Sequence, residues 1–198
     1  MSVLVTKQAP DFNADAVLDD GSMGKLTLSQ FRGQYVVLFF YPLDFTFVCP
    51  TEIIAFDHRL ADFTTRNVQV IGVSVDSIHA HWAWRQVKVK DGGIGEIRYP
   101  LVADITKSIA RDYDVLLGDA IALRGSFLID KDGVVQHQVV NNLPLGRNID
   151  EMLRLVDALQ FTEHHGEVCP AGWSAGKAGM KDTHDGVAEY LSKNARKL

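Results

Sequence analysis

Between residues 41 and 52 the chain reads Tyr41-Pro42-Leu43-Asp44-Phe45-Thr46-Phe47-Val48-Cys49-Pro50-Thr51-Glu52. An apolar run, residues 35–40, precedes it; this run is rich in strand-forming side chains and too short to span a membrane. After it, apolar side chains return at roughly helical spacing, at Ile53, Ile54, Phe56, Leu60 and Phe63. The sequence therefore predicts a buried strand, a turn, and a helix over residues 52–66.

Cys49 falls at or within the first turn of the predicted helix. Pro50 suits the first helical position, because its missing N–H would have no partner there. The free N–H groups of a first turn and the positive end of the helix dipole favour a thiolate. Position alone leaves two interpretations open, a nucleophilic cysteine or a small buried apolar residue.

Pro42 and Thr46 extend the motif to Pro-x-x-x-Thr-x-x-Cys, which ends at Cys49. The segment Phe39 to Glu52 resembles the active-site segment of the peroxiredoxins, in particular the typical two-cysteine group that includes the peroxidase subunit of bacterial alkyl hydroperoxide reductase. The resemblance implies a thiol-specific peroxidase that reduces hydrogen peroxide and organic hydroperoxides through a sulfenic acid on Cys49. It covers the chain clearly from about residue 7 to residue 173, and less so to residue 191.

Peroxide cleavage requires an aligned peroxide and stabilisation of charge on two oxygens. The Thr46 hydroxyl can donate to a thiolate and accept from a peroxide; its plain alternative is a helix cap. Pro42 would shield the sulfur from water or end the strand, and both can hold at once.

A cation is expected beside the thiolate, and the resemblance points to Arg124 in Ala122-Leu123-Arg124-Gly125-Ser126. A guanidinium suits this role because it stays charged and donates in a fixed fork. Taken alone, an arginine before a strand is usually a solvated side chain. Glu52 and Arg147 match family positions that orient this arginine, and a solvent-exposed ion pair is their equally plain alternative.

Cys169 lies in Gly166-Glu167-Val168-Cys169-Pro170-Ala171-Gly172-Trp173, which resembles the segment that carries the resolving cysteine of the same group. A sulfenic acid condenses with a second thiolate to a disulfide. In the family this disulfide joins two subunits, so the resemblance implies a homodimer, with decamers of five dimers common. It also implies reduction by thioredoxin or by a dedicated disulfide reductase, such as a flavoprotein.

Composition excludes several other classes of protein. The chain has 198 residues, 46% of them hydrophobic, and a net charge of −5 without a basic stripe, which argues against a nucleic-acid partner. No apolar run approaches the roughly 20 residues of a membrane helix, and no signal peptide is visible at the N-terminus. We therefore expect a cytoplasmic protein without a membrane partner, in which two distant cysteines are free or redox-active.

The rest of the chain alternates strand and helix patterns. A second core strand is predicted over residues 68–75, a helix over 77–89, a short strand over 99–103 and a short helix over 107–113. Asp132-Gly133 marks the clearest hairpin, between residues 125–130 and 134–140. A further helix begins at Asn148, and its apolar stripe is expected to pack on the sheet.

A βαβ unit followed by a hairpin and a helix predicts an α/β fold with a central mixed sheet flanked by helices, and the resemblance makes this a thioredoxin-like fold. We expect two parts, a peroxidase domain over residues 1–162 and a C-terminal arm over 163–198. The arm is too short to bury a core of its own and ends in a short helix over 187–195.

No metal or cofactor is expected, because the histidines do not fall at metal-ligand spacing; His79, His81 and the His164-His165 pair are more often solvated or packed. Two alternative functions account for these residues less well. A general thiol–disulfide oxidoreductase would need Cys-x-x-Cys, and Thr46 stands where its first cysteine would lie. An oligomeric holdase chaperone would make no use of Pro42, Thr46 or Arg124.

Residues 92–95, Gly-Gly-Ile-Gly, resemble the Gly-Gly-Leu-Gly motif that accompanies sensitivity to overoxidation in some relatives. The partner of that motif is a C-terminal Tyr-Phe, where this chain has Tyr190-Leu191. The departure leaves overoxidation sensitivity open.

Overall fold

The computed structural model describes residues 3–197, and the chain divides after Ile149 into two compact units. The first holds a seven-stranded sheet in the order β2 (Met23–Thr27), β1 (Asn13–Val17), β5 (Leu101–Ala103), β4 (Val68–Ser74), β3 (Tyr35–Phe40), β8 (Arg124–Ile129) and β9 (Val135–Asn141). β3, β4 and β5 run parallel, whereas β8 is antiparallel to β3 and β1 is antiparallel to β5. The predicted central mixed sheet is confirmed. The domain boundary expected at residue 162 stays a prediction.

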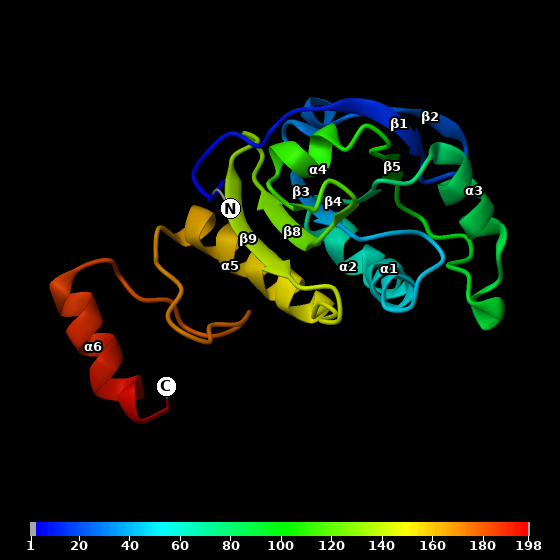
Figure 1. Cartoon of the computed structure of the whole chain (residues 1–198). Helices are drawn as coiled ribbons and strands as arrows, with labels where there is room; N and C mark the ends of the chain where they lie inside the picture. Colours follow the sequence, from blue (N-terminus) through cyan, green and yellow to red (C-terminus); the bar gives the residue numbers. More distant parts are fainter. Residues whose placement is uncertain (1–2, 198) are drawn as a thin grey trace. The chain divides into compact units, whose positions relative to one another are not determined.

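Helices cover both faces of this sheet, which explains why all six residues of β3 are buried. On one face Leu38 and Phe40 join a core cluster with Ile109 of α4 (Ser108–Asp112). On the other face the ring of Phe39 stacks on that of Phe56 in α1 (Cys49–His58), with ring centroids 4.3 Å apart. Figure 1 shows α1 and α2 (Leu60–Thr65) on the side of the sheet opposite α4. The strand that leads to Cys49 is therefore held from both sides.

The single helix predicted over residues 52–66 is wrong in one respect, because the structure breaks it at Arg59. Arg59 has φ −98° and ψ 4°, outside the helical range, and separates α1 from α2. The carbonyl of Asp57 accepts a hydrogen bond of 2.9 Å from the guanidinium of Arg98, which also binds the Asp57 carboxylate at 3.0 Å. A residue 41 positions away thus occupies a backbone acceptor at the break.

The remaining predicted elements are present, with bounds that differ from the prediction. The helix expected over 77–89 is α3 (Ile78–Gln86), capped by the Ser77 side chain, followed by a 3-10 turn η2 (Val89–Asp91). β8 and β9 form the predicted hairpin, whose Gly133 has φ +77°. The sequence did not predict the β1–β2 hairpin or the two-residue strands β6 (Leu116–Leu117) and β7 (Ile121–Ala122).

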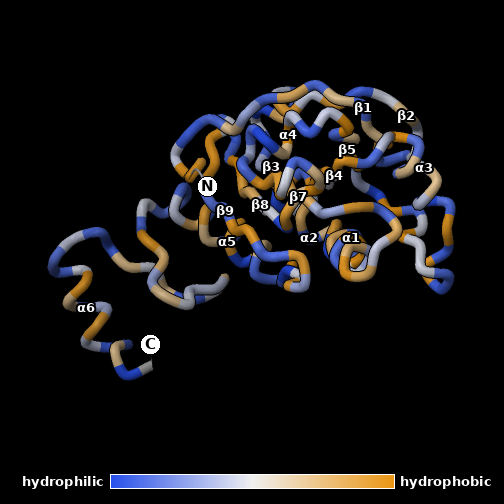
Figure 2. Tube along the Cα trace, in the orientation of Figure 1, coloured by the Kyte–Doolittle hydropathy of each residue, from blue (hydrophilic) through white to orange (hydrophobic). Residues whose placement is uncertain are grey.

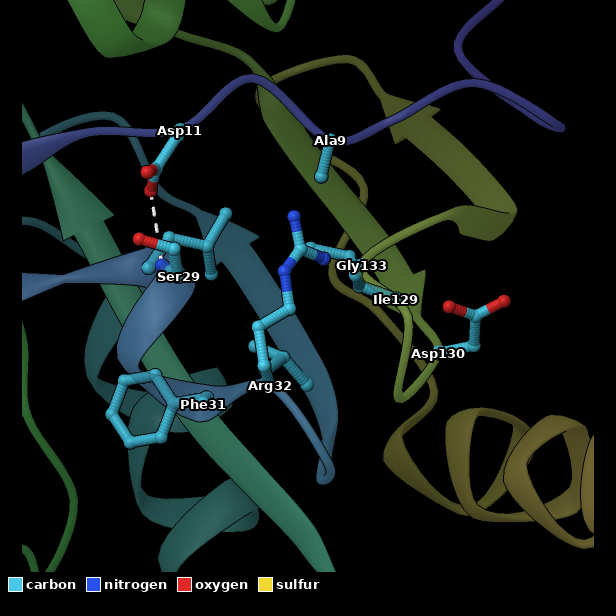
Figure 3. Close-up of a pocket in the computed structure, with 10 residues that line it drawn as sticks. Ala9, Asp11, Ser29, Phe31, Arg32, Ile129, Asp130 and Gly133 are labelled. Atoms are coloured by element: carbon cyan, nitrogen blue, oxygen red, sulfur yellow. Dashed lines mark hydrogen bonds between the residues drawn. The ribbon is translucent and has the colours of Figure 1, made fainter.

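The segment before β1 is fastened to the β8–β9 turn by Arg32, which follows the 3-10 turn η1 (Leu28–Phe31). Figure 3 shows the Arg32 side chain reaching between Ala9 and Gly133. Its guanidinium donates to Gln8 Oε1 at 3.0 Å and fills the space where a side chain at residue 133 would begin. Asp11 accepts from the backbone N–H of Ser29 at 3.0 Å in the same pocket. The Arg32 side chain and these hydrogen bonds occupy the pocket, so they hold the N-terminal segment in place.

The second unit contains α5 (Ile149–His165) apart from its first residue, α6 (His184–Asn194) and the 3-10 turn η3 (Ala195–Lys197) that follows α6. Between the helices, Val168 and Met180 form an isolated antiparallel bridge. Hydrophobic and hydrophilic residues alternate along α6 in Figure 2. None of the helices described is long and apolar enough to cross a bilayer.

Candidate active site

Cys49 is the first residue of α1, with its side chain completely buried. Val48 is the N-cap and makes no side-chain capping bond, and Pro50 follows at the start of the helix, as predicted. The sulfur therefore lies at the positive end of a ten-residue helix, where backbone N–H groups lack helical partners. This position favours negative charge on the sulfur.

Thr46 faces the sulfur from the loop between β3 and α1. Its Oγ1 lies 2.9 Å from Cys49 Sγ and 2.8 Å from the carbonyl oxygen of Leu43. A hydroxyl has one proton and can donate it to only one of these two acceptors. When the sulfur is a thiolate the hydroxyl can donate to it; when it is a thiol, the S–H can donate to Thr46 Oγ1 while the hydroxyl turns to Leu43.

Arg124 begins β8 and brings a guanidinium to the same sulfur. Its Nη1 lies 3.5 Å from Cys49 Sγ and 2.7 Å from Glu52 Oε2, and its Nε donates to the carbonyl of Leu143 at 2.7 Å. Only 4% of the Arg124 side chain is exposed. A solvated arginine before a strand is thereby ruled out, because three acceptors fix the direction of the fork.

Glu52 is shared between Arg124 and Arg147. Arg147 donates from Nε to Glu52 Oε1 and from Nη2 to Glu52 Oε2, each at 2.8 Å, and its backbone N–H also binds Oε1 at 2.8 Å. Burial raises the pKa of Glu52, but the bonds and charge of Arg147, with the charge of Arg124, outweigh it and hold this pKa below its ordinary value. The carboxylate is therefore ionised and bridges two guanidinium groups.

Arg147 is in turn fixed by the sheet. Its Nη1 donates to the carbonyls of Phe40 and Gly125 at 2.8 and 2.9 Å and lies 3.2 Å from Ser126 Oγ. Its guanidinium also stacks over the ring of Phe39, 5.1 Å from the centroid. The structure thus brings together Cys49, Thr46, Glu52, Arg124 and Arg147, as the sequence predicted. Pro42 is buried in the same loop.

A buried polar network, which no sequence motif indicated, lies behind this loop. Asp44 accepts from the Tyr41 hydroxyl at 2.8 Å and lies 2.7 Å from Nδ1 of His81, whose Nε2 faces the carbonyl of Val102 at 3.2 Å. Burial raises the pKa of Asp44 against the opposing bond from His81. The Asp44 backbone N–H also binds Asp76 at 2.9 Å. This network anchors the loop between β3 and Thr46, and no local pattern links residues 44 and 81.

Cys169 lies in the second unit in a different environment. It is a free thiol and is half-buried, and its Sγ donates to the carbonyl of Ala158 on α5 at 3.6 Å. Burial raises the pKa of Cys169, with the positive charge of Arg154 opposing the rise. A carbonyl acceptor stabilises S–H, so this position favours the protonated thiol.

Comparison with known proteins assigns the family. The AhpC/TSA family matches residues 5–138, and the C-terminal domain of 1-Cys peroxiredoxin matches residues 158–193. This chain belongs to the AhpC/TSA family.

Individual peroxiredoxins agree with this assignment. Alkyl hydroperoxide reductase C of Helicobacter pylori (strain J99) is 62% identical over 198 residues, which covers 99% of this chain and 100% of that protein. Peroxiredoxin-2 of Mus musculus is 54% identical over 96% of both chains. The reduced 2-Cys peroxiredoxin of Plasmodium vivax superposes with a TM-score of 0.95 at 54% identity, over 96% of this chain and 100% of that chain. The predicted peroxiredoxin family, the thioredoxin-like fold and the peroxidase activity are confirmed; the holdase alternative is not favoured.

Proposed function

We propose that this peroxiredoxin reduces hydrogen peroxide and organic hydroperoxides in a two-cysteine cycle that begins at Cys49. The observation that carries the proposal is the position of Cys49 Sγ, 2.9 Å from the Thr46 hydroxyl and 3.5 Å from the Arg124 guanidinium. Two donors around a buried sulfur favour its thiolate, which is the form that attacks peroxide.

In the first step the Cys49 thiolate attacks the terminal peroxide oxygen, the O–O bond breaks and the second oxygen leaves as alkoxide or hydroxide, which takes up a proton. Thr46 and Arg124 align the peroxide and stabilise charge on its oxygens, and Pro42 keeps water from the sulfur. Glu52 and Arg147 touch neither the sulfur nor the peroxide; they hold Arg124 in place.

In the second step Cys169 of a partner subunit condenses with the Cys49 sulfenic acid to an intersubunit disulfide, and water leaves. A homodimer follows from this step. It is supported by β9, which lies at an edge of the sheet among the strands described and could pair with a second copy. Assembly to a decamer, and reduction by thioredoxin or a dedicated disulfide reductase, are further parts of the proposal.

Disulfide formation requires the two Cα atoms to come within roughly 7 Å. A sulfur as buried as Cys49 is unsuited to such an approach, so we expect the first turn of α1 after Phe47 to unwind on oxidation and the arm beyond residue 163 to loosen. A cytoplasmic location, where thiols are kept reduced, completes the proposal; cell fractionation tests it.

Two serine substitutions test the cycle in a peroxide-consumption assay with thioredoxin and its reductase. Cys49→Ser should abolish turnover, and Cys169→Ser should consume one equivalent of peroxide and then stop. The same assay without thioredoxin shows whether thioredoxin serves as the reductant. A Cys49→Ser protein that consumed peroxide at nearly the wild-type rate would refute the proposal.

A further inference from the structure

Arg154 of α5 fastens the segment that carries Cys169, here called the resolving segment (residues 169–173). Its Nη1 donates to the carbonyl of Trp173 at 2.8 Å. Its Nε and Nη2 donate to the two carboxylate oxygens of Glu151, one helical turn earlier, at 2.7 Å each. The bidentate pair with Glu151 fixes the plane of the guanidinium, so that the remaining donor is directed at the resolving segment.

We propose that Arg154 is a positioning residue for the second step of the peroxidase cycle: it clamps the resolving segment on α5 and so limits how fast the Cys169 thiol becomes available. The proposal rests on the role of Cys169 in the proposed function. Nothing in the peroxide-cleaving step involves Arg154, whose contacts lie within the second unit.

The clamped position holds Cys169 in an unreactive form. Its Sγ donates to the Ala158 carbonyl at 3.6 Å, and burial raises its pKa. Both influences favour S–H, whereas the thiolate is the form that attacks a sulfenic acid. Release from α5 removes the carbonyl and the burial together, so release and activation are one event.

Trp173 transmits the clamp to Cys169. The Trp173 backbone N–H donates to the carbonyl of Pro170 at 3.0 Å, which closes a tight turn directly after Cys169. The Trp173 ring packs on Phe161 of α5 with centroids 4.8 Å apart, and only 3% of the residue is exposed. Since the turn is short and the ring is buried, the bond from Arg154 to the Trp173 carbonyl also holds Cys169.

The chemistry of the step defines what the clamp controls. The Cys169 thiolate attacks the sulfur of the Cys49 sulfenic acid, an S–S bond forms, and the S–O bond breaks. The hydroxide that leaves combines with the proton lost by the Cys169 thiol to give water. Cys169 is oxidised and the sulfenic sulfur is reduced, so no other reagent is needed.

Arg154 has a second influence with the opposite consequence, because its charge lowers the pKa of Cys169. If charge were its main contribution, removing Arg154 would slow the attack of Cys169 near neutral pH. If its main contribution is to clamp the segment, removing Arg154 should speed the attack of Cys169. The rate at high pH, where the thiol is fully ionised, separates the two effects because it depends on access alone.

The direct test measures alkylation of Cys169 by iodoacetamide as a function of pH in the Cys49→Ser protein, which retains one thiol. Arg154→Met, which lacks donor and charge, should raise the high-pH rate roughly two- to tenfold, the factor that corresponds to one hydrogen bond. Arg154→Lys, which retains the charge but not the planar fork of donors, should fall between this variant and the parent. An unchanged high-pH rate in Arg154→Met, with only the midpoint of the profile displaced, would overturn the clamp.

Arg111→Met is the matched control, because Arg111 is an exposed arginine of the first unit that also pairs with a carboxylate, Asp119, at 3.4 Å. Its alkylation profile should match the parent, and thermal unfolding should show each variant folded at the assay temperature. A faster rate in this control would mean that loss of any surface arginine exposes Cys169, and would also overturn the proposal.

In the protein with both cysteines, rapid quenching and mass spectrometry follow the oxidation states of Cys49 after one equivalent of peroxide. Arg154→Met should form sulfenic acid at the parent rate, convert it to disulfide two- to tenfold faster, and yield less sulfinic acid at high peroxide. Cys169→Ser measured alongside keeps the two hypotheses apart: a disulfide on Cys49 in that variant would contradict the role of Cys169, whereas an unaltered conversion rate in Arg154→Met contradicts the clamp alone.

Discussion

The two cysteines of this chain sit in opposite surroundings. Cys49 Sγ is completely buried and faces two donors, the Thr46 hydroxyl at 2.9 Å and the Arg124 guanidinium at 3.5 Å. Cys169 Sγ is half-buried and faces an acceptor, the carbonyl of Ala158 at 3.6 Å. Donors stabilise a thiolate and an acceptor stabilises a thiol. The surroundings of Cys49 therefore favour the reactive form, whereas those of Cys169 favour the unreactive one.

The frameworks around the two sulfurs differ as well. The groups at Cys49 come from β8, from α1 and from two loops, and Glu52 ties them into one buried network. The groups at Cys169 come from one helix and a turn after it. We therefore expect substitutions around Cys49 to cost activity or stability heavily, and substitutions around Cys169 to shift rates by small factors.

Glu52→Gln should have the largest effect, because it leaves two buried guanidinium groups without their shared anion. Loss of one partner of a buried ion pair typically costs about 3–5 kcal/mol, equivalent to a change of at least a hundredfold in the unfolding equilibrium. Urea unfolding of the reduced protein at neutral pH measures this loss. A variant within about 1 kcal/mol of the parent would contradict the bridging role of Glu52.

The same residue predicts how stability depends on pH. The pKa of Glu52 in the folded protein lies below its ordinary value of 4.5. Its contribution is therefore fully present above about pH 4.5 and is lost as the pH falls through the lowered folded value. The difference in unfolding free energy between the parent and Glu52→Gln should be constant near neutrality and shrink under acidic conditions. A difference that stayed constant would contradict the assignment.

Arg124→Ala should slow peroxide attack by roughly a hundred- to a thousandfold, the usual range for a donor at a developing charge. Its guanidinium contacts the sulfur of Cys49 directly and is held in place by the carboxylate of Glu52. Stopped-flow measurement of the first step isolates this effect from disulfide formation. Arg98→Ala, which removes an exposed arginine that pairs with Asp57 near the C-terminal end of α1, serves as the control and should leave the rate unchanged.

Thr46→Val should slow the same step by roughly ten- to a hundredfold, since it removes one neutral donor and retains the shape of the side chain. Thr46→Ser retains the hydroxyl and should recover most of the rate. If Thr46→Val kept the parent rate, the hydroxyl would not be the group that matters; if Thr46→Ser were as slow as Thr46→Val, the γ-methyl group would be needed as well as the hydroxyl.

The sequence was most informative where neighbouring residues share one environment. The uniform apolar runs of β3 and β4 correctly predicted buried strands, and Asp132-Gly133 correctly predicted the hairpin. β1 and β2 escaped prediction because they are five residues long and mix polar side chains with a glycine, Gly24, so their strand character depends on pairing with each other.

The site residues likewise divide into those that a local motif indicates and those that only distant contacts bring together. Cys49, Thr46, Arg124, Glu52 and Arg147 could be named because each stands in a recognisable motif. The Asp44–His81 contact joins residues 37 apart, and His81 in isolation resembles any packed or solvated helical histidine. The hydrogen bond from Arg98 to the carbonyl of Asp57 beside the break likewise joins residues 41 apart. Contacts of this kind arise only once the strands have brought distant segments together.

The smallest effect is expected at Leu191, which lies on α6 with 42% of its surface exposed. In relatives sensitive to overoxidation a phenylalanine stands at this position, and we expect its larger ring to hold the arm more firmly. A few tens of Å² of additional apolar burial corresponds to less than about 1 kcal/mol, a factor of two or three in the docked population. Leu191→Phe should therefore slow disulfide formation and raise the yield of Cys49 sulfinic acid at high peroxide by that factor.

Ser192→Phe places the same ring on a neighbouring face of α6 and should leave the yield unchanged. Mass spectrometry of Cys49 after graded peroxide decides the matter: equal sulfinic yields in the parent and Leu191→Phe would show that residue 191 does not restrain the arm, and the contrast between the two thiols would then rest on Arg154 and its neighbours.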